Sequence, residues 1–372
     1  RVQSAWGCLF FFETVCTMSQ TVLVTGATGY IALEICKQLL TAGEFKVRGT
    51  VRSLANEKRN KPLLDLVPSA EHKIELVEAD LLSAGGWEKA IEGVDFVLHT
   101  ASPFFVAGKR EGEQKLVKPA VEGTLNVLRA CAAEGSSVQR VVLTSSVAAV
   151  AYGRELGPDY VYAESDWSDA DNVDAYTRSK TVAERAAWDF VAQNEGHKFT
   201  LTTINPSLVV GPLLGSPGTS VGIIADMLNG KLPMYAPLQF GVVDVRDVAR
   251  AHVLAIKSDK APGNRYIVSA TERWLKDMAD RLSDEFTPQG YKLPRKQVPY
   301  AVAWVASFFM APMENIVKSW GRGLKVDGSK SEKDLGFRYM DVDKSVVETA
   351  YALIEMGVVP KTPAYKGAPA RE

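Results

Sequence analysis

The sequence predicts a doubly wound α/β fold with a mostly parallel sheet, followed by a smaller α+β part. Short apolar runs alternate with helical segments through the first half of the chain, and such alternation favours parallel strands joined by right-handed crossovers. The runs at residues 22–25, 94–99 and 138–144 are almost wholly apolar, as strands are when helices cover both faces of a sheet. From Pro206 on, prolines and glycines interrupt the pattern, so a more irregular region begins there.

The expected elements are short apolar or β-branched runs for strands and segments with apolar residues three and four apart for helices. The helix expected at residues 113–133, for example, places Leu116, Ala120 and Leu128 on one face. In the first half we expect strands at residues 22–25, 46–51, 73–79, 94–99, 138–144 and 199–205, a helix after the first strand that runs through Leu40, and helices at residues 54–67, 86–91, 113–133 and 174–194. In the second half we expect helices at residues 221–229, 245–257, 274–285, 300–310 and 344–356, and a strand at residues 265–269.

Composition is that of an ordinary globular protein. The chain has 372 residues, of which 46% are hydrophobic and 23% charged, enough for one large domain and a smaller part. The net charge of −1 gives no indication of a nucleic-acid partner. The four histidines and four cysteines lack metal-ligand spacing, and Cys36 and Cys131 fall on apolar helix faces, so we expect no metal and a reducing, cytoplasmic location.

Two segments differ from the rest of the chain. Residues 298–313 are strongly apolar, but Pro299 and Pro312 bound them and leave about a dozen helical residues, where a membrane span needs about 20. We therefore expect a buried or pocket-covering helix there and no stable membrane span. Residues 1–17 contain the basic Arg1 and the apolar run Leu9–Phe12, as a short targeting segment would, but this run is shorter than a usual signal-peptide core and Glu13 interrupts it. Because Met18 sits just before the first strand, we expect a non-native or disordered extension.

A glycine-rich turn follows the first strand. The stretch TVLVTGATGYIA at residues 21–32 places Gly26, Gly29 and Ala32 at three-residue steps before a helix. Glycine lets the backbone approach a pyrophosphate, and the helix N-terminus offers free N–H groups and a partial positive charge. The stretch alone is equally compatible with a tightly packed strand–helix turn that binds nothing.

Tyr176 and Lys180 are four residues apart on an expected helix, so they share one face. An adjacent ammonium lowers the pKa of a phenol, ordinarily about 10, toward the range of a general acid. Ser146 ends the run Thr144-Ser145-Ser146 after an apolar strand, where a hydroxyl can donate to a substrate carbonyl. Each feature alone is also typical of an exposed helix or a polar strand end, whereas their combination with the glycine-rich turn is much harder to obtain by accident.

In this combination the chain resembles the extended short-chain dehydrogenase/reductase superfamily. Within it the resemblance is to the dihydroflavonol reductase-like branch, which includes cinnamoyl-CoA reductases and fungal aldehyde and methylglyoxal reductases. The resemblance covers about residues 18–359. Its motifs, in order, are GATGYIA, TVR at residues 50–52, EADL at 78–81, VLHTASP at 97–103, EGTLNVLRAC at 122–131, RVVLTSS at 140–146, ESDWSD at 164–169, YTRSKTVAERAAW from Tyr176, and the later NPSLVVGP, DVRDVARAH and SEKDLGF.

The resemblance implies a Rossmann sheet, with the cofactor and the substrate bound by successive parts of the chain. Residues 18–205 would form the NADP-binding domain with the catalytic residues, and residues 206–359 the substrate-binding part, interleaved with late sheet strands. Residues 360–372 would be a flexible tail. By the same resemblance Tyr176 donates a proton, Lys180 holds the nicotinamide ribose and lowers the pKa of that tyrosine, and Ser146 helps to polarise the carbonyl.

The cofactor expected is NADP(H). An acidic residue at the end of the second strand would indicate NAD, but this chain has Arg52 there, with Lys58 and Arg59 soon after. A guanidinium suits a 2′-phosphate because its planar fork matches the phosphate oxygens. The resemblance assigns further contacts to the glycine-rich turn, to an adenine-side pair, to the exit of the fourth strand and to a carboxamide-side loop. These residues are Gly26, Thr28, Gly29, Tyr30, Ile31, Asp80, Leu81, Thr100, Ala101, Ser102, Pro206 and Val209.

The expected function is NADPH-dependent reduction of an aldehyde or ketone by a monomer or homodimer. Ala151 stands where plant flavonoid-reducing members carry Asn, which argues against a flavonoid substrate. The Asn that completes the catalytic set in many short-chain reductases has no counterpart near Pro119. The alternatives are a 3β-hydroxysteroid-type dehydrogenase, a sugar-nucleotide epimerase, or an NADP-sensing module without turnover. Residues 213–240 and 300–313 are expected to shape the substrate pocket.

Overall fold

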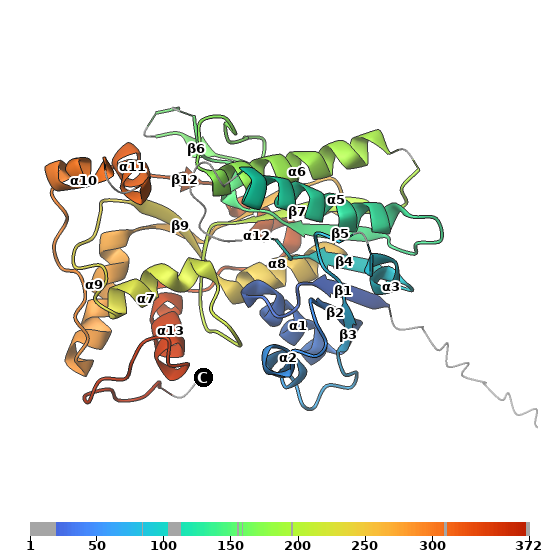
Figure 1. Cartoon of the computed structure of the whole chain (residues 1–372), viewed down its shortest axis with the longest axis horizontal. Coiled ribbons are helices and arrows are strands. Elements are labelled where there is room, and N and C mark those ends of the chain that lie inside the picture. Colours follow the sequence, from blue (N-terminus) through green and yellow to red (C-terminus); the bar gives the residue numbers. More distant parts are fainter. Residues whose placement is uncertain are drawn as a thin grey trace, which may run out of the picture.

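The centre of the molecule is a seven-stranded sheet with helices on both faces (Figure 1). This computed structural model describes residues 20–369 apart from 84, 103–112, 155, 158, 195 and 309–310. The strands lie in the order β10-β7-β5-β4-β1-β2-β3 with every pairing parallel, which confirms the predicted α/β fold. Their bounds are β1 (Thr21–Thr25), β2 (Lys46–Val51), β3 (Glu75–Glu78), β4 (Phe96–His99), β5 (Arg140–Thr144), β7 (Thr200–Pro206) and β10 (Arg265–Val268).

The strand order reverses between β1 and β4. From β1 the chain moves outward through β2 to β3, and then returns to add β4, β5 and β7 on the other side of β1. In sheets of this kind ligands bind in the crevice outside the carboxyl ends of the strands at the point of reversal. The helices that pack on this sheet are α1 (Tyr30–Ala42), α2 (Glu57–Leu64), α3 (Trp87–Ile91), α5 (Lys118–Ala132), α6 (Ala175–Gln193) and α8 (Val245–Lys257). The π-helix η1 (Glu113–Val117) directly precedes α5.

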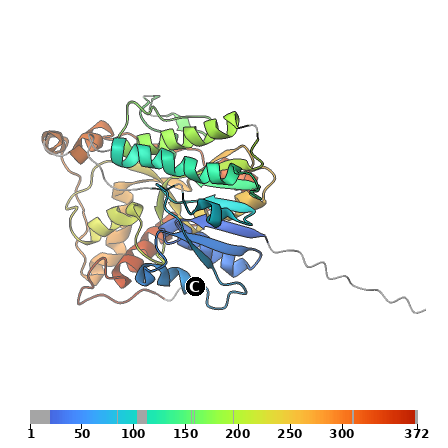
Figure 2. The same ribbon diagram turned by 45° about the vertical axis from the view of Figure 1, so that its right-hand side comes forward.

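Alternate residues of the central strand face the two helical layers, because successive side chains of a strand point to opposite faces. Val22 and Val24 are buried with side chains of α1 and α8, whereas Leu23 is buried with side chains of α3 and α5. Helices α5 and α6 lie side by side on the second face in both views (Figures 1 and 2). The burial of Cys36 and Cys131 in these layers matches their expected position on apolar helix faces.

The C-terminal part has its own core and a second sheet. Strand β9 pairs in parallel with β8 and antiparallel with β11, and helices α7, α9 and α13 enclose a separate apolar cluster. A two-stranded pairing of β12 with β6 completes the part. Its elements are β8 (Leu208–Val210), α7 (Gly222–Leu228), β9 (Gln239–Asp244), β11 (Thr271–Trp274), α9 (Leu275–Phe286), α10 (Tyr300–Ser307), α11 (Ala311–Lys318), β12 (Lys325–Val326), α12 (Ser329–Leu335) and α13 (Val342–Glu355), with β6 (Val161–Tyr162) from the first half.

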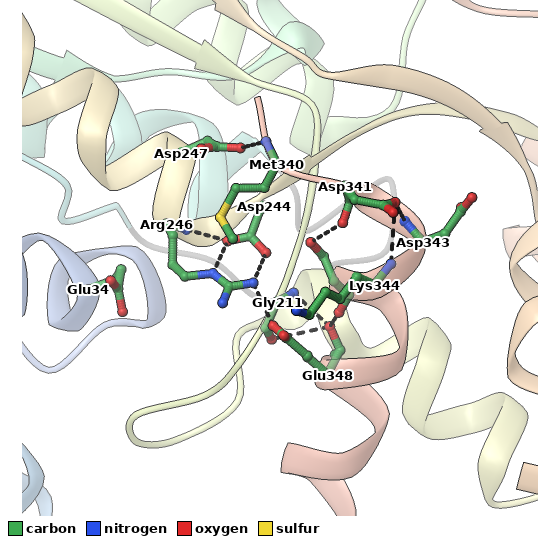
Figure 3. Close-up of polar contacts among 12 residues, drawn as sticks. Glu34, Gly211, Asp244, Arg246, Asp247, Met340, Asp341, Asp343, Lys344 and Glu348 are labelled. Atoms are coloured by element: carbon green, nitrogen blue, oxygen red, sulfur yellow. Dashed lines mark hydrogen bonds and ion pairs between the residues drawn. The ribbon is translucent and has the colours of Figure 1, made fainter. Parts of the chain in front are cut away.

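An ion cluster joins the two parts at the start of α8 (Figure 3). Arg246 donates through Nη2 to Asp244 Oδ2 at 2.7 Å and to Glu348 Oε2 on α13 at 2.5 Å. Beside it, Thr349 Oγ1 accepts from the N–H of Gly211 at 2.6 Å. We call Gly211, Asp244, Arg246, Glu348 and Thr349 the α8–α13 clamp. It fixes the end of β8 between a helix of the main sheet and a helix of the C-terminal part.

One expectation about the C-terminal part is wrong. Helix α10 is neither buried nor pocket-covering: Tyr300, Trp304 and Phe308 are about half exposed or more, and Ala303 is buried. Apolar residues occupy all sides of this helix, so the sequence contains no sign of which side is covered. Among the described residues, no helix is both long and apolar enough to cross a membrane.

The segment expected to be a flexible tail makes hydrogen bonds over residues 360–366. Tyr291 donates through its hydroxyl to the Pro360 carbonyl at 3.1 Å, and Tyr365 donates to Glu355 Oε1 at 2.9 Å. The N–H of Lys366 donates to Gln289 Oε1 at 3.2 Å. The ring of Tyr365 also lies against those of Tyr291 and of Tyr351 on α13. The extension expected at residues 1–17 lies outside the described residues.

Candidate active site

One cavity of about 1280 Å³ opens at the carboxyl ends of the sheet. It receives side chains or backbone from the ends of β1, β2, β3, β4, β5 and β7, from α6, and from the chain that leads into α7. All of the residues expected to act in catalysis or to bind the cofactor line it, except Lys58. These are Gly26, Thr28, Gly29, Tyr30, Ile31, Arg52, Arg59, Asp80, Leu81, Thr100, Ala101, Ser102, Ser146, Tyr176, Lys180, Pro206 and Val209.

The glycine-rich turn has the geometry that a pyrophosphate needs. Gly26 has a φ of 61°, and a Cβ there would lie 2.9 Å from the Cβ of Ala101, so only glycine fits. Gly29 is the N-cap of α1, no side chain caps that end, and the first turn contains no acidic residue. The first N–H groups of α1 therefore face the cavity without a negative neighbour, an arrangement that suits a bound anion.

Two guanidinium groups stand where the second strand ends. Arg52 directly follows β2, and Arg59 lies on α2, which Asn56 caps by accepting from the N–H of Arg59 at 3.2 Å. The Arg59 Nε also donates to Thr28 Oγ1 at 3.2 Å, which ties α2 to the glycine-rich turn. Both side chains line the cavity, whereas Lys58 does not. Asn56 itself also lines it, and sequence reasoning missed it because its signal is only that of a helix N-cap.

The end of β4 is fastened to the end of β1. Thr100 donates through Oγ1 to the carbonyl of Thr25 at 2.6 Å, and the N–H of Ala101 donates to Thr25 Oγ1 at 3.1 Å. The His99 Nδ1 lies 2.8 Å from the same Thr25 hydroxyl. Burial, with Lys180 as the second cause, lowers the pKa of His99 to about 3, so this imidazole is neutral. The floor of the cavity is thus held by neutral hydrogen bonds.

Ser146, Tyr176 and Lys180 meet at the middle of the cavity. Ser146 follows β5 in extended conformation and accepts through Oγ from the N–H of Ala148 at 3.1 Å. Tyr176 and Lys180 lie on α6, whose first turn is capped by Asp174; its Oδ1 accepts from the N–H of Tyr176 at 2.8 Å. The side chains of Ser146 and Tyr176 are hydrogen-bonded to each other. The cap and this hydrogen bond fix the phenol over the end of β5.

Burial dominates the electrostatics of this group. It raises the pKa of Tyr176, and the hydrogen bond to Ser146 opposes that shift. The expected lowering of the Tyr176 pKa is therefore wrong, because the cost of placing a phenolate in this site outweighs other influences. Burial also lowers the pKa of Lys180 to about 8, against the opposing charge of Glu184. Tyr176 is thus a protonated phenol beside a lysine that titrates near neutral pH.

Apolar and small polar residues form the rest of the cavity wall. The expected region 213–240 contributes Gly218, Thr219, Ser220, Ile223 and Phe240 to it, whereas no described residue of 300–313 reaches it. The 3₁₀ turn η2 (Val147–Ala149) and the start of β8 supply the rest. Tyr152 and Leu208 were missed; closeness in sequence to Ser146 and to Pro206 was their only signal.

The chain is similar to known oxidoreductases over most of its length. A model of the NAD dependent epimerase/dehydratase family matches residues 22–269. A cinnamoyl-CoA reductase of Medicago truncatula is 36% identical, over 91% of this chain and 97% of that protein. A putative NADPH-dependent methylglyoxal reductase of Candida albicans is 34% identical, over 90% of this chain and 99% of that protein.

Solved structures agree with these relatives. Gre2 from Candida albicans in complex with NADPH has a TM-score of 0.74 at 32% identity and covers 90% of this chain and 99% of its own. Yeast methylglyoxal/isovaleraldehyde reductase Gre2 complexed with NADPH has a TM-score of 0.75 at 29% identity, over 91% of this chain and 100% of its own. The chain is therefore similar to NADPH-dependent reductases both in sequence and in fold.

Proposed function

The chain belongs to the NAD dependent epimerase/dehydratase family and is an NADP-dependent oxidoreductase; from this premise we propose that it reduces an aldehyde or ketone to an alcohol. The observation that carries the proposal is the hydrogen-bonded pair of Ser146 and Tyr176 beside Lys180, in the cavity that contains the glycine-rich turn. A proton donor, a second hydroxyl and a dinucleotide-type turn in one cavity are what carbonyl reduction requires.

The cavity fits NADPH by its own chemistry. The uncapped start of α1 and the glycine at residue 26 suit the pyrophosphate, and Arg52 and Arg59 suit the 2′-phosphate. Asp80 and Leu81 would lie at the adenine, and Thr100, Ala101, Ser102, Pro206 and Val209 at the nicotinamide end. When bound there, NADPH supplies the hydride that reaches the carbonyl carbon.

Side chains of the protein then bind and protonate the carbonyl oxygen of the substrate. The Ser146 and Tyr176 hydroxyls hold the carbonyl oxygen, and Tyr176 transfers its proton to that oxygen as it becomes an alkoxide. The raised pKa of Tyr176 keeps the phenol protonated before the reaction. Protonated Lys180 stabilises the phenolate that the transfer leaves behind, until a proton from solvent restores the phenol.

The substrate is proposed to be an uncharged, largely apolar carbonyl compound. Val147, Leu208, Ile223 and Phe240 line the cavity. Among the described residues of the cavity wall, the cationic side chains are those of Arg52, Arg59 and Lys180, which are assigned to the cofactor and to the phenol. An aliphatic or aromatic aldehyde or ketone is favoured over a carboxylate-bearing one.

The test is NADPH consumption by the purified protein with a panel of carbonyl compounds that starts from methylglyoxal and isovaleraldehyde. We expect turnover with apolar members of the panel. Tyr176→Phe removes the proton donor and should lower kcat by about 100-fold to 10,000-fold, while NADPH affinity changes little. Tyr160→Phe, at an exposed tyrosine whose hydroxyl bonds Asp166, is the matched control. Full turnover by Tyr176→Phe would refute the proposed mechanism, and an epimerase would show no net NADPH consumption.

A further inference from the structure

A buried carboxylate, Glu184, lies beneath the proposed catalytic group and has no part in the mechanism above. It is on α6, four residues after Lys180 and eight after Tyr176, and its side chain is fully buried. A carboxylate is seldom buried unless it is paired and hydrogen-bonded. The contacts of Glu184 therefore indicate what its position achieves.

Glu184 joins α6 to three strands of the main sheet. Its Oε2 accepts from Ser145 Oγ at 2.5 Å, at the end of β5, and from Asn205 Nδ2 at 2.7 Å on β7. Its Oε1 accepts from Thr203 Oγ1 at 3.1 Å, also on β7, and from Arg265 Nε at 2.6 Å on β10. Both oxygens are thus saturated with donors from the sheet that carries the active-site serine.

The ionic partner is buried as well. The Arg265 side chain is 9% exposed, and its guanidinium lies 3.8 Å over the ring of Trp167. Its Nη1 donates to the carbonyls of Glu164 and Asp166, each at 2.6 Å. A buried ion pair of this kind is weak evidence for stability, because desolvation offsets much of the attraction. What such a pair does supply is a fixed geometry.

Two of the donors to Glu184 are connected to the backbone of Ser146, one by a hydrogen bond and one by the chain. Asn205 Nδ2 donates to the carbonyl oxygen of Ser146 at 3.2 Å, and Ser145 is the residue before it. The side chain of Asn205 therefore connects the Glu184 carboxylate to the backbone of Ser146. On α6, Glu184 lies one helical turn after Lys180. A small cavity of about 10 Å³ between these elements is lined by both Lys180 and Glu184.

We propose that Glu184 is a positioning residue of the active site. It holds the strand end that carries Ser146 against the helix that carries Tyr176 and Lys180, and it supplies the negative charge that faces Lys180. This inference rests on the proposed function. The charged and titratable groups around Lys180 are Glu184 and Tyr176 on α6, neutral His99 on β4, and Arg265 on β10 beyond Glu184.

The test is the pH profile of carbonyl reduction by Glu184→Gln. The amide has the size of the carboxylate but removes its charge, so Lys180 loses its proton at lower pH. We expect the alkaline limb of the kcat profile to lie about one pH unit lower than in the wild type. At neutral pH kcat should fall about tenfold, while the affinity for NADPH stays within about twofold of the wild-type value. Glu34→Gln, at a buried carboxylate of α1 outside the cavity, should leave the profile unchanged.

A second variant keeps the proposal falsifiable if Glu184→Gln fails to fold. Ser145→Ala removes one hydrogen bond to Glu184 but leaves its charge, so we expect a kcat lowered about threefold with KM and the alkaline limb unchanged. A Glu184→Gln enzyme that loses stability but keeps the wild-type alkaline limb would overturn the proposal, as would wild-type kcat in Ser145→Ala. Full turnover by Tyr176→Phe would instead contradict the proposed function itself.

Discussion

Lys180 and Tyr176 show how a single turn of helix sets the chemistry of a site. The sequence predicted their shared face and their place beside Ser146, because i and i+4 spacing on a helix and the end of a parallel strand are local properties. It did not predict the direction of the Tyr176 pKa shift. That direction depends on how deeply the phenol is buried by side chains from elsewhere in the chain, and burial raises the value.

The lysine gives a pH prediction. Burial lowers the pKa of Lys180 to about 8, so its positive charge is present below that pH and lost above it. If the charge stabilises the phenolate, kcat for carbonyl reduction should be flat below about pH 8 and fall above it, measured at saturating NADPH and substrate. In Lys180→Arg the cation does not titrate in this range, so the limb should disappear. A wild-type limb near pH 10 would contradict this role of Lys180.

At the scale of elements, the α8–α13 clamp depends on one glycine. Gly211 has a φ of 123°, and a Cβ there would lie 2.9 Å from Asp244 Oδ2. Gly211→Ala therefore combines backbone strain with displacement of the Asp244–Arg246 pair. We expect it to lower the free energy of unfolding by at least about 2 kcal/mol more than Gly230→Ala does, as measured by denaturant titration.

Gly230 is the matched control for that comparison. It also has a positive φ, 70°, but a Cβ there would meet no atom within 4 Å. Its replacement tests the backbone strain alone. Equal losses in the two variants would show that the contact with Asp244 is of no consequence.

The helices and strands differ in how far local sequence pattern predicted them. Helix α8 (Val245–Lys257) has the predicted bounds, because Asp244 caps it and its apolar face is continuous. The strands β8, β9 and β11 were missed; β8 lies among prolines and glycines, and β11 has only four residues. Helix α10 was expected to be covered, yet its apolar side chains are exposed, because hydrophobicity alone does not identify a neighbour.

At the scale of the whole molecule, the cavity is built where the large sheet faces the C-terminal part. Residues far apart in the sequence meet there: the hydroxyl of Tyr30 donates to the carbonyl of Gly211 at 3.0 Å. The sequence predicted the sheet, and the residues proposed to bind the cofactor line one cavity at its carboxyl edge. It left the substrate side open, because that wall comes from irregular chain whose path no periodicity describes.

Cofactor preference is a property of the assembled cavity and gives a further prediction. Arg52→Asp replaces the proposed 2′-phosphate ligand by a group with the same charge as the phosphate and should weaken NADPH binding at least about tenfold, while NADH binding changes less than about twofold. The measurement is the dissociation constant for each nucleotide, by fluorescence or calorimetry. Lys58→Asp makes the same charge change at an exposed residue outside the cavity and should leave the preference intact. Equal weakening of both nucleotides in Arg52→Asp would remove Arg52 from the 2′-phosphate site.

The central claim is that the protein transfers a hydride from NADPH to a carbonyl carbon. It is tested most directly with NADPH deuterated at the transferable position of the nicotinamide and the best substrate of the carbonyl panel. We predict an alcohol that carries one deuterium on the former carbonyl carbon, formed in equal amount to the NADP⁺ produced, and formed about 100-fold to 10,000-fold more slowly with Tyr176→Phe. An alcohol without deuterium, or oxidation of NADPH without any alcohol, would contradict the account.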